Sequence, residues 1–200
     1  MMKDREVLKA VYIEEVRRGK STVHSISTAL GGSEELSPVI DRMVERGLLK
    51  RARGRLSITN LGRKRIKSVM IGGAFEIIHP GHLHTIREAK RLGDALVVVV
   101  ATNEAVRRNK GREPVTDEDA RVELVSSLKE VDLAILGGHG SIYESLERVR
   151  PDIVAIGYDQ KHDAEEINRE GRRRGLNVRV VRLGTPIPEI KTTKIVNEFR

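Results

Sequence analysis

Two histidines, His79 and His82, lie three residues apart in the stretch 71–82, which reads IGGAFEIIHPGH. Its apolar start predicts a strand, its glycine pair a turn, and Pro80 the first residue of a helix. Backbone N–H groups at a helix start lie at the positive end of the helix dipole, and this position suits a phosphate. Gly81 lets a ligand approach the backbone closely. The stretch predicts an anion site with two imidazole donors; the alternative is a structural corner with incidental histidines.

The elements that would position these histidines form an alternating pattern from residue 69 onward. Residues 95–101 are apolar on both faces, as a central parallel strand must be. The pattern predicts an open five-stranded parallel Rossmann-like α/β sheet with right-handed crossovers, and the glycine turn lies at its ligand-binding carboxyl edge. Residues 102–116 read as a polar loop. Strands are expected at 69–71, 95–101, 133–136, 153–156 and 178–181, with helices after Pro80, at 117–128, 142–149 and 163–174, and at the C-terminus.

Charge divides the chain into two parts. The whole sequence has 37 basic and 29 acidic side chains, and residues 1–68 hold sixteen of the basic and eight of the acidic ones. This asymmetry predicts two domains with different partners, at 1–66 and 67–200. The absence of cysteine excludes thiol chemistry. With no apolar run long enough for a membrane span or a signal peptide, we expect a cytoplasmic protein without a membrane partner.

The first domain reads as three helices followed by a basic hairpin. Ser37 is expected to cap the third helix, with Pro38 as its first helical residue, and two short strands flank a turn near Gly54. Residues 48–67 hold eight basic side chains and no acidic one. These features resemble a small α+β winged helix-turn-helix domain. In the second helix, expected over 22–30, the buried side chains would be Ile26, Ala29 and Leu30.

The resemblance to winged helices implies a double-stranded DNA partner. The third helix would enter the major groove, and Arg51, Arg53 and Arg55 of the hairpin would contact phosphates. Asp41 and Glu45, on the exposed face of the third helix, would repel phosphate. The alternative is a solvated basic face that serves dimerisation or covers the other domain, so a homodimer is compatible with the sequence.

The His79–His82 stretch resembles the nucleotidyltransferases that share an H-x-G-H motif, and this resemblance extends over residues 69–200. The run KGREP at 110–114, Arg121 and GYDQ at 157–160 match the cytidylyltransferase-like branch, as does TTKI at 192–195. Within that branch the sequence is most similar to the archaeal-type FAD synthases, which adenylylate FMN with ATP.

This resemblance implies a division of roles within the site. His79 and His82 would donate hydrogen bonds to the triphosphate, Lys110 on its loop would fold over the phosphates, and a divalent ion such as Mg²⁺ would neutralise the remaining charge. Read from the residues alone, Lys110 can equally be a solvated loop lysine, and Thr192 and Asp159 can be ordinary helix caps. The implied nucleotide-binding residues are Gly73, Ala74, Phe75, His79, Pro80, Gly81, His82, Asp159, Thr192 and Thr193.

Departures from the wider family separate the alternatives. Glu76 stands where an aspartate is usual and Ala74 where a threonine is usual, and residues 186–193 lack the arginine typical of glycerol-3-phosphate cytidylyltransferases. The missing arginine favours FAD synthase over a CTP-dependent cytidylyltransferase for a small alcohol phosphate. A third reading is a winged-helix regulator with a nucleotide- or flavin-sensing domain, against which the intact histidine pair argues. His139, after the third strand of the sheet, is a further candidate for contact with substrate.

Overall fold

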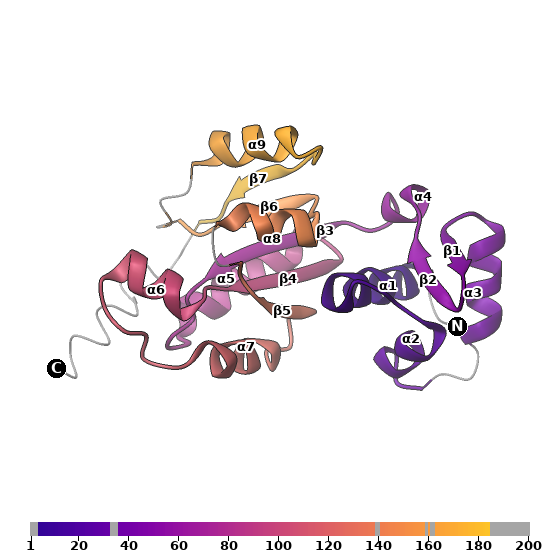
Figure 1. The fold of residues 1–200 in the computed structure, drawn as a ribbon, viewed down its shortest axis with the longest axis horizontal. Coiled ribbons are helices and arrows are strands. Elements are labelled where there is room, and N and C mark those ends of the chain that lie inside the picture. The colour runs from indigo at the N-terminus through magenta and orange to yellow at the C-terminus, as the bar shows by residue number, and fades with distance from the viewer. Residues whose placement is uncertain (1–3, 33–35, 139–140, 159, 161–162, 185–200) are drawn as a thin grey trace. The chain divides into compact units, whose positions relative to one another are not determined.

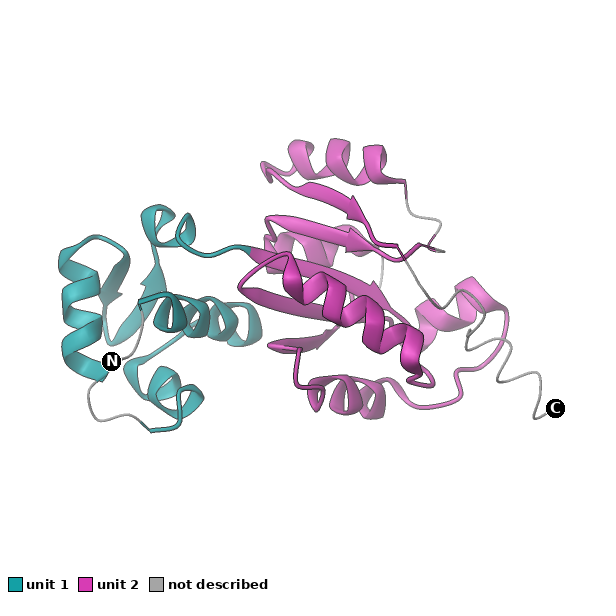
Figure 2. Ribbon diagram, turned by 180° about the vertical axis from the view of Figure 1, so that it is seen from behind, with its two compact units in different colours: residues 1–67 teal, residues 68–200 magenta. Residues whose placement is uncertain are grey.

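The computed structural model describes residues 4–32, 36–138, 141–158, 160 and 163–184. The chain divides into two compact units, unit 1 at Met1–Lys67 and unit 2 at Ser68–Arg200 (Figure 2). Each unit has its own buried residues. No helix of the described ranges is both long and apolar enough to cross a membrane.

Unit 1 consists of helices around one apolar core and a two-stranded hairpin. Its elements are α1 (Asp4–Arg18), α2 (Val23–Ala29), α3 (Leu36–Glu45), β1 (Leu49–Ala52), β2 (Arg55–Ile58) and α4 (Asn60–Arg63). The strands β1 and β2 pair antiparallel, and an isolated bridge joins Ser21 to Leu56. Side chains that are almost fully buried come from α1, α2, α3 and the hairpin, among them Val7, Val11, Ile26, Ile40, Met43 and Leu56.

Two local predictions for unit 1 were wrong. The helix α3 begins at Leu36, so Ser37 and Pro38 lie within its first turn instead of forming its cap and first residue. Leu36 is 2% exposed, and its burial against the core draws this residue into the helix. In α2 only Ile26 is buried, while Ala29 is exposed and Leu30 is half-buried.

Unit 2 is built on a five-stranded sheet in which every strand pair is parallel (Figure 1). Its strands are β3 (Ser68–Gly73), β4 (Ala95–Val100), β5 (Leu133–Leu136), β6 (Ile153–Ile156) and β7 (Arg179–Arg182). They lie in the order β5-β4-β3-β6-β7. This confirms the predicted open parallel α/β sheet, and the order reverses between β3 and β6, where such sheets bind ligands.

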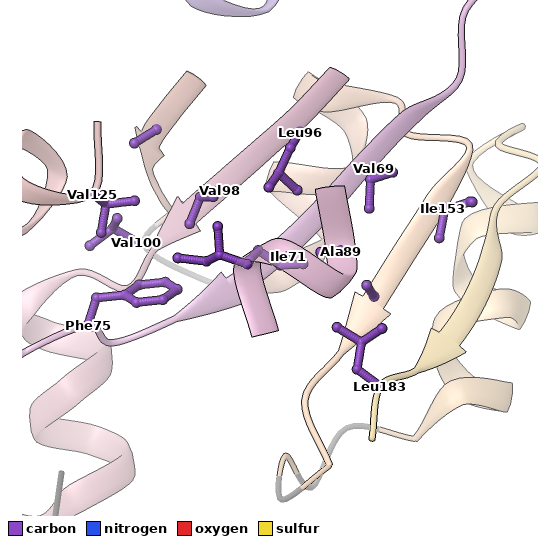
Figure 3. Packing of buried hydrophobic residues seen from close by; sticks show 13 residues of the cluster. Val69, Ile71, Phe75, Ala89, Leu96, Val98, Val100, Val125, Ile153 and Leu183 are labelled. Atoms are coloured by element: carbon purple, nitrogen blue, oxygen red, sulfur yellow. The ribbon is translucent and has the colours of Figure 1, made fainter. Parts of the chain in front are cut away.

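Helices cover both faces of this sheet. Figures 1 and 2, seen from opposite sides, show α5 (Pro80–Arg91) on one face and α8 (Ile142–Val149) on the other. The core beneath α5 and α7 (Glu118–Ser126) is aliphatic apart from Phe75, and Figure 3 shows its side chains between the strands and α5. A further crossover helix, α9 (Ala164–Arg173), lies between β6 and β7. Residues of this core include Val69, Ile71, Ile86, Ala89, Leu96, Val98, Val100 and Val125.

The expected polar loop at 102–116 contains a helix, α6 (Asn103–Lys110), which the prediction missed. Thr102 caps α6, its hydroxyl accepting a hydrogen bond from the Ala105 N–H, and Gly111 ends it with φ of 66°. Only Val106 of α6 is buried, so the helix has almost no apolar stripe in its sequence. In α7, the large apolar side chain of Leu124 is 48% exposed.

The strand pairing is uneven across the sheet. The central strand β3 pairs with β4 along six residues, from Ser68 to Gly73, but with β6 only at Val69 and Met70. Beyond Met70 the two strands no longer pair, and the carboxyl edge opens between them. We call this short pairing the β3–β6 seam.

Candidate active site

The turn that leaves β3 has a strained backbone. Phe75 has φ of 51°, a conformation that bulky side chains rarely adopt, and its side chain is 4% exposed. Its ring folds back over Gly73, where an added Cβ would lie 2.8 Å from the ring atom Cε2. Only glycine at position 73 leaves room for the ring in this position. Strain of this kind is concentrated at functional sites, because the surrounding structure must maintain it.

The two predicted histidines meet at the start of α5. His79 is the N-cap residue but its side chain does not cap the helix, and Pro80 follows as the first helical residue. The ring centroids of His79 and His82 lie 3.9 Å apart, and the Phe75 ring lies 5.2 Å from His82. The Nδ1 atom of each imidazole is buried. The helix start therefore presents two adjacent imidazoles on an apolar support.

Glu76 is the buried carboxylate of this turn, with no exposed side-chain area. Its Oε1 atom accepts hydrogen bonds from Arg112 Nη1 at 2.7 Å and from the Val115 N–H at 3.1 Å. Its Oε2 atom accepts from Lys110 Nζ and from Arg112 Nη2, the latter at 3.2 Å. The segment after α6 is thus attached to the turn after β3 through one carboxylate.

These contacts determine the charge of Glu76. Burial alone would raise the pKa of this carboxyl group, but hydrogen bonds from Arg112, Lys110 and the Val115 N–H outweigh burial. The pKa is lowered from 4.5 to about 2. Glu76 is consequently ionised at neutral pH.

Arg121, on α7, is a buried cation that joins three segments. Its side chain donates to the carbonyl oxygens of Ala74 at 2.6 Å, Ala101 at 2.7 Å and Thr116 at 3.1 Å, and to Asn103 Oδ1 at 2.8 Å. The residue is 1% exposed, and its burial lowers the pKa of the guanidinium. Arg121 thereby fixes the turn after β3 to the end of β4 and to the segment before α7.

Gln160 spans the open part of the β3–β6 seam. Its side-chain Nε2 donates to the Gly72 carbonyl at 2.7 Å, and its Oε1 accepts from the Gly157 N–H at 3.1 Å. The backbone loop after β6 is therefore held beside the glycine turn after β3. This places GYDQ, as far as it is described, at the same edge as the histidines.

The structure brings one group of predicted residues together at the start of α5. This group is Gly73, Ala74, Phe75, His79, Pro80, Gly81 and His82. Lys110 joins it through Glu76, although it ends a helix instead of lying on a loop. Asp159, Thr192, Thr193 and His139 lie outside the described residues.

Sequence reasoning missed the structural roles of Glu76, Arg112 and Gln160. All three stood within quoted motifs, but no role in positioning the site was assigned to any of them. No set of three or more histidine, aspartate or glutamate side chains that could hold a metal ion occurs among the described residues. Glu76 is engaged by two cations, so it does not fit a resident metal ion.

A parallel sheet with a glycine turn and an imidazole-bearing helix start defines a nucleotide-binding α/β domain. The sequence profile of the cytidylyltransferase-like family matches residues 70–198, and the chain belongs to this family. The match begins after unit 1.

Relatives of known name are similar over much of their length. A protein of Aciduliprofundum boonei named FAD synthase is 53% identical over 115 residues, which are 58% of this chain and 76% of the relative. An FAD synthase of Thermococcus onnurineus is 45% identical over 140 residues, 68% of this chain and 93% of the relative. A lipopolysaccharide core biosynthesis protein from Thermoplasma volcanium, known from its crystal structure, is 44% identical in sequence to this chain. The two structures match with a TM-score of 0.58 over 60% of this chain and 98% of the other.

Proposed function

We propose that the protein is an FAD synthase, which transfers AMP from ATP to FMN and releases pyrophosphate. The observation that carries the proposal is the pair of adjacent imidazoles, 3.9 Å apart between ring centroids, at the start of α5, which follows the strained turn at the carboxyl edge of the sheet. The name of the relatives, FAD synthase, gives the product, and ATP and FMN are the substrates that the resemblance implies.

The proposed reaction needs no protein nucleophile. A phosphate oxygen of FMN attacks the α-phosphorus of ATP, a new P–O bond forms, and the bond to the β-phosphate breaks so that pyrophosphate leaves with the electron pair. The protein contributes positioning and stabilisation of charge. His79 and His82 donate hydrogen bonds to the triphosphate, where negative charge grows as pyrophosphate departs, and the positive end of the α5 dipole adds to this field.

Lys110 exchanges partners in this mechanism. In the structure its ammonium contacts Glu76, and its side chain is 30% exposed, compared with 19% for Arg112 and none for Glu76. Lys110 can therefore turn toward a phosphate while Arg112 keeps the buried carboxylate paired. Without Arg112 the same movement would leave a buried charge unpaired, which typically costs about 3–5 kcal/mol.

Several finer assignments extend the proposal. Asp159 would line the ATP site, and Thr192 and Thr193 would bind the β- and γ-phosphates, as the resemblance implies. Mg²⁺ commonly keeps most of its ligands as water and phosphate oxygens. Since the described residues offer no cluster for it, we expect the ion to enter as the MgATP complex.

Unit 1 has the element order of a winged helix. One helix leads to the bridge at Ser21, two further helices follow, and then come an antiparallel hairpin and the short helix α4. The bridge to Leu56 adds a third extended segment to the hairpin, as the Leu56 N–H donates to the Ser21 carbonyl at 2.9 Å. We assign unit 1 to this class on that order of elements.

The activity is tested by incubating the full chain with Mg²⁺, ATP or CTP, and FMN or glycerol 3-phosphate. Pyrophosphate release is followed, and the flavin product is identified by chromatography. The proposal expects pyrophosphate and FAD with ATP plus FMN only. Turnover of CTP with glycerol 3-phosphate, without FAD formation, would replace it with the cytidylyltransferase.

His82→Ala tests the imidazole pair. Loss of one preorganised donor to a developing charge typically lowers kcat about 10²-fold, so we expect at least that decrease in FAD formation. His84→Ala is the matched control, because His84 lies on the same helix two residues further and has no part in the site. A kcat unchanged by His82→Ala would remove this imidazole from the mechanism.

A further inference from the structure

The side-chain amide of Gln160 stands in for a peptide group between β3 and β6. The ladder of these strands ends at Met70, and the Gly72 carbonyl lies beyond it. This carbonyl accepts a hydrogen bond from Gln160 Nε2 at 2.7 Å, while Gln160 Oε1 accepts from the Gly157 N–H at 3.1 Å. A primary amide offers a donor and an acceptor, as a peptide group does. One side chain therefore links the two strands where their backbones no longer pair.

The interposed amide sets the width of the crevice between β3 and β6. Backbone pairing brings neighbouring strands to about 4.8 Å from each other, and a side-chain amide between two backbones needs more room than a direct hydrogen bond. At the same time it satisfies two backbone groups, on Gly72 and Gly157, that the opening would otherwise leave without that partner. The crevice lies at the reversal of strand order, where open α/β sheets bind their ligands.

Arg182, the last residue of β7, holds the same loop from the other side. Its Nη1 atom donates to the Gly157 carbonyl at 3.2 Å and to the Gln160 carbonyl at 3.0 Å. The Gln160 N–H also donates to the Gly157 carbonyl at 3.2 Å. Gly157 and Gln160 are thus attached to β7 through a guanidinium and to β3 through an amide. We call the side chains of Gln160 and Arg182 the loop clamp.

The sheet does not need the loop clamp to hold β3 and β6 together. At their amino ends the strands pair at Val69 and Met70. Beside this pairing, the Ser68 N–H and hydroxyl both donate to Asp152 Oδ2, at 2.7 Å and 3.0 Å. The loop clamp lies at the opposite, carboxyl end, and Arg182 is exposed there. Its contacts therefore fix the loop after β6 at the edge where a nucleotide is expected.

We propose that Gln160 and Arg182 are positioning residues, which fix the loop after β6 in the arrangement that binds the nucleoside triphosphate. The inference rests on the proposed function in that it takes a nucleotide as the ligand of this edge. The apparent Kd of a ligand equals its intrinsic Kd divided by the fraction of molecules already in the binding arrangement. Loss of the loop clamp lowers this fraction, so it weakens nucleotide binding and raises KM. The kcat at saturating nucleotide stays the same, because the bound loop is the same.

The first test measures MgATP and MgCTP binding to the full chain by titration calorimetry, together with KM and kcat for FAD formation. Gln160→Met has a similar length and no charge but lacks both hydrogen bonds, so we expect Kd and KM to rise about tenfold and kcat to change less than about threefold. Gln160→Glu can still accept from the Gly157 N–H but cannot donate to the Gly72 carbonyl, and it should show the same weakening. Asn177→Asp makes the same change from amide to carboxylate at an exposed position of unit 2 and should bind as the natural protein does.

The second test replaces Arg182, which is exposed and whose loss does not threaten folding. Arg182→Gln should weaken MgATP binding severalfold, whereas Arg182→Lys, whose ammonium can donate to the same two carbonyls, should retain most of the affinity. Arg179→Gln is the matched control, because Arg179 is an exposed arginine at the other end of β7.

The outcomes separate this inference from the proposed function. Unchanged nucleotide affinity in Gln160→Met, or a fall in kcat with an unchanged KM, would overturn the positioning role. Equal losses in Arg182→Gln and Arg179→Gln would overturn the part of Arg182. A natural protein that binds neither nucleotide would overturn both the inference and the proposed function. Nucleotide binding that depends on the loop clamp, without any FAD formed, would overturn the proposed function alone.

Discussion

Replacement of Glu76 by glutamine isolates the contribution of one buried charge. Glutamine has nearly the same shape and can accept hydrogen bonds, but it cannot form ion pairs with Lys110 and Arg112. The pKa of Glu76 falls from 4.5 to about 2 in the folded protein. Since each tenfold change in proton affinity corresponds to about 1.4 kcal/mol, the ionised carboxylate stabilises the fold by about 3 kcal/mol. We expect Glu76→Gln to lose up to that amount at pH 7.

The pH dependence of this loss follows from the direction of the pKa change. A group whose pKa is lowered on folding stabilises the protein fully above the pKa of the unfolded chain, and the stabilisation disappears as the pH falls through the pKa of the folded state. The difference between the natural protein and Glu76→Gln should therefore be constant above about pH 5.5. It should fall to about half its value near pH 3, between the two pKa values of 4.5 and about 2.

The assay is urea unfolding at several pH values, followed by far-UV circular dichroism. MgATP identifies the unfolding transition of unit 2, because a ligand that binds the folded unit shifts that transition to a higher urea concentration. Glu113→Gln is the control, because Glu113 is 73% exposed and pairs with Arg107 on the surface. Such pairs contribute about 0–1 kcal/mol. A Glu76→Gln loss that equals the control, or that stays constant between pH 7 and pH 3, would refute the reasoning.

Two further substitutions probe the support of the site. In Gly73→Ala the new Cβ would lie 2.8 Å from the Phe75 ring, which in turn contacts His82; we expect kcat/KM to fall at least tenfold. The matched Gly72→Ala, whose Cβ meets nothing closer than 3.7 Å, should lose much less, and equal losses would contradict this account. Arg121→Lys keeps the charge but cannot reach four acceptors in three segments, so thermal unfolding should show a loss of about 2–4 kcal/mol. The control Arg108→Lys changes an exposed residue of α6 and should leave the melting temperature unchanged. If Arg121→Lys were as stable as this control, the proposed role of Arg121 would be contradicted.

The sheet could be predicted from the sequence because its signals are local. Residues 95–101 are apolar on both faces, and this pattern identifies a buried parallel strand without knowledge of its neighbours. The glycine turn and Pro80 likewise fix the start of α5 within a few residues. The prediction that His79 and His82 lie together at a helix start followed from this placement alone.

The helix α6 was missed although its ends carried local signals. Thr102 and Gly111 are a typical N-cap and C-terminal glycine, and three basic side chains occupy the last turn. The interior of α6 buries only Val106, so its apolar periodicity was too weak to indicate a helix. Cap residues were a better guide here than the apolar pattern.

The network around Glu76 lay beyond sequence reasoning for a different reason. Its partners Lys110 and Arg112 are 34 and 36 residues away along the chain, and no local pattern relates a carboxylate to cations at such separations. Arg121 had been noted in a motif, yet its four acceptors come from segments that only the fold brings together. The burial of a charged residue can be recognised only once the packing is known.

The β3–β6 seam has a mechanical consequence. The two parts of the sheet, β5-β4-β3 and β6-β7, are joined laterally by two residue pairs, by hydrogen bonds between Ser68 and Asp152, and by the Gln160 side chain. Because this pairing is shorter than the six-residue ladder between β3 and β4, a tilt of one part about Val69 and Met70 would leave that ladder intact. In a dinucleotide synthase the product is bulkier than either substrate. A hinge at this place would let the site widen for release of the product, and the hydrogen bond from Gln160 to the Gly72 carbonyl would hold the site closed before release.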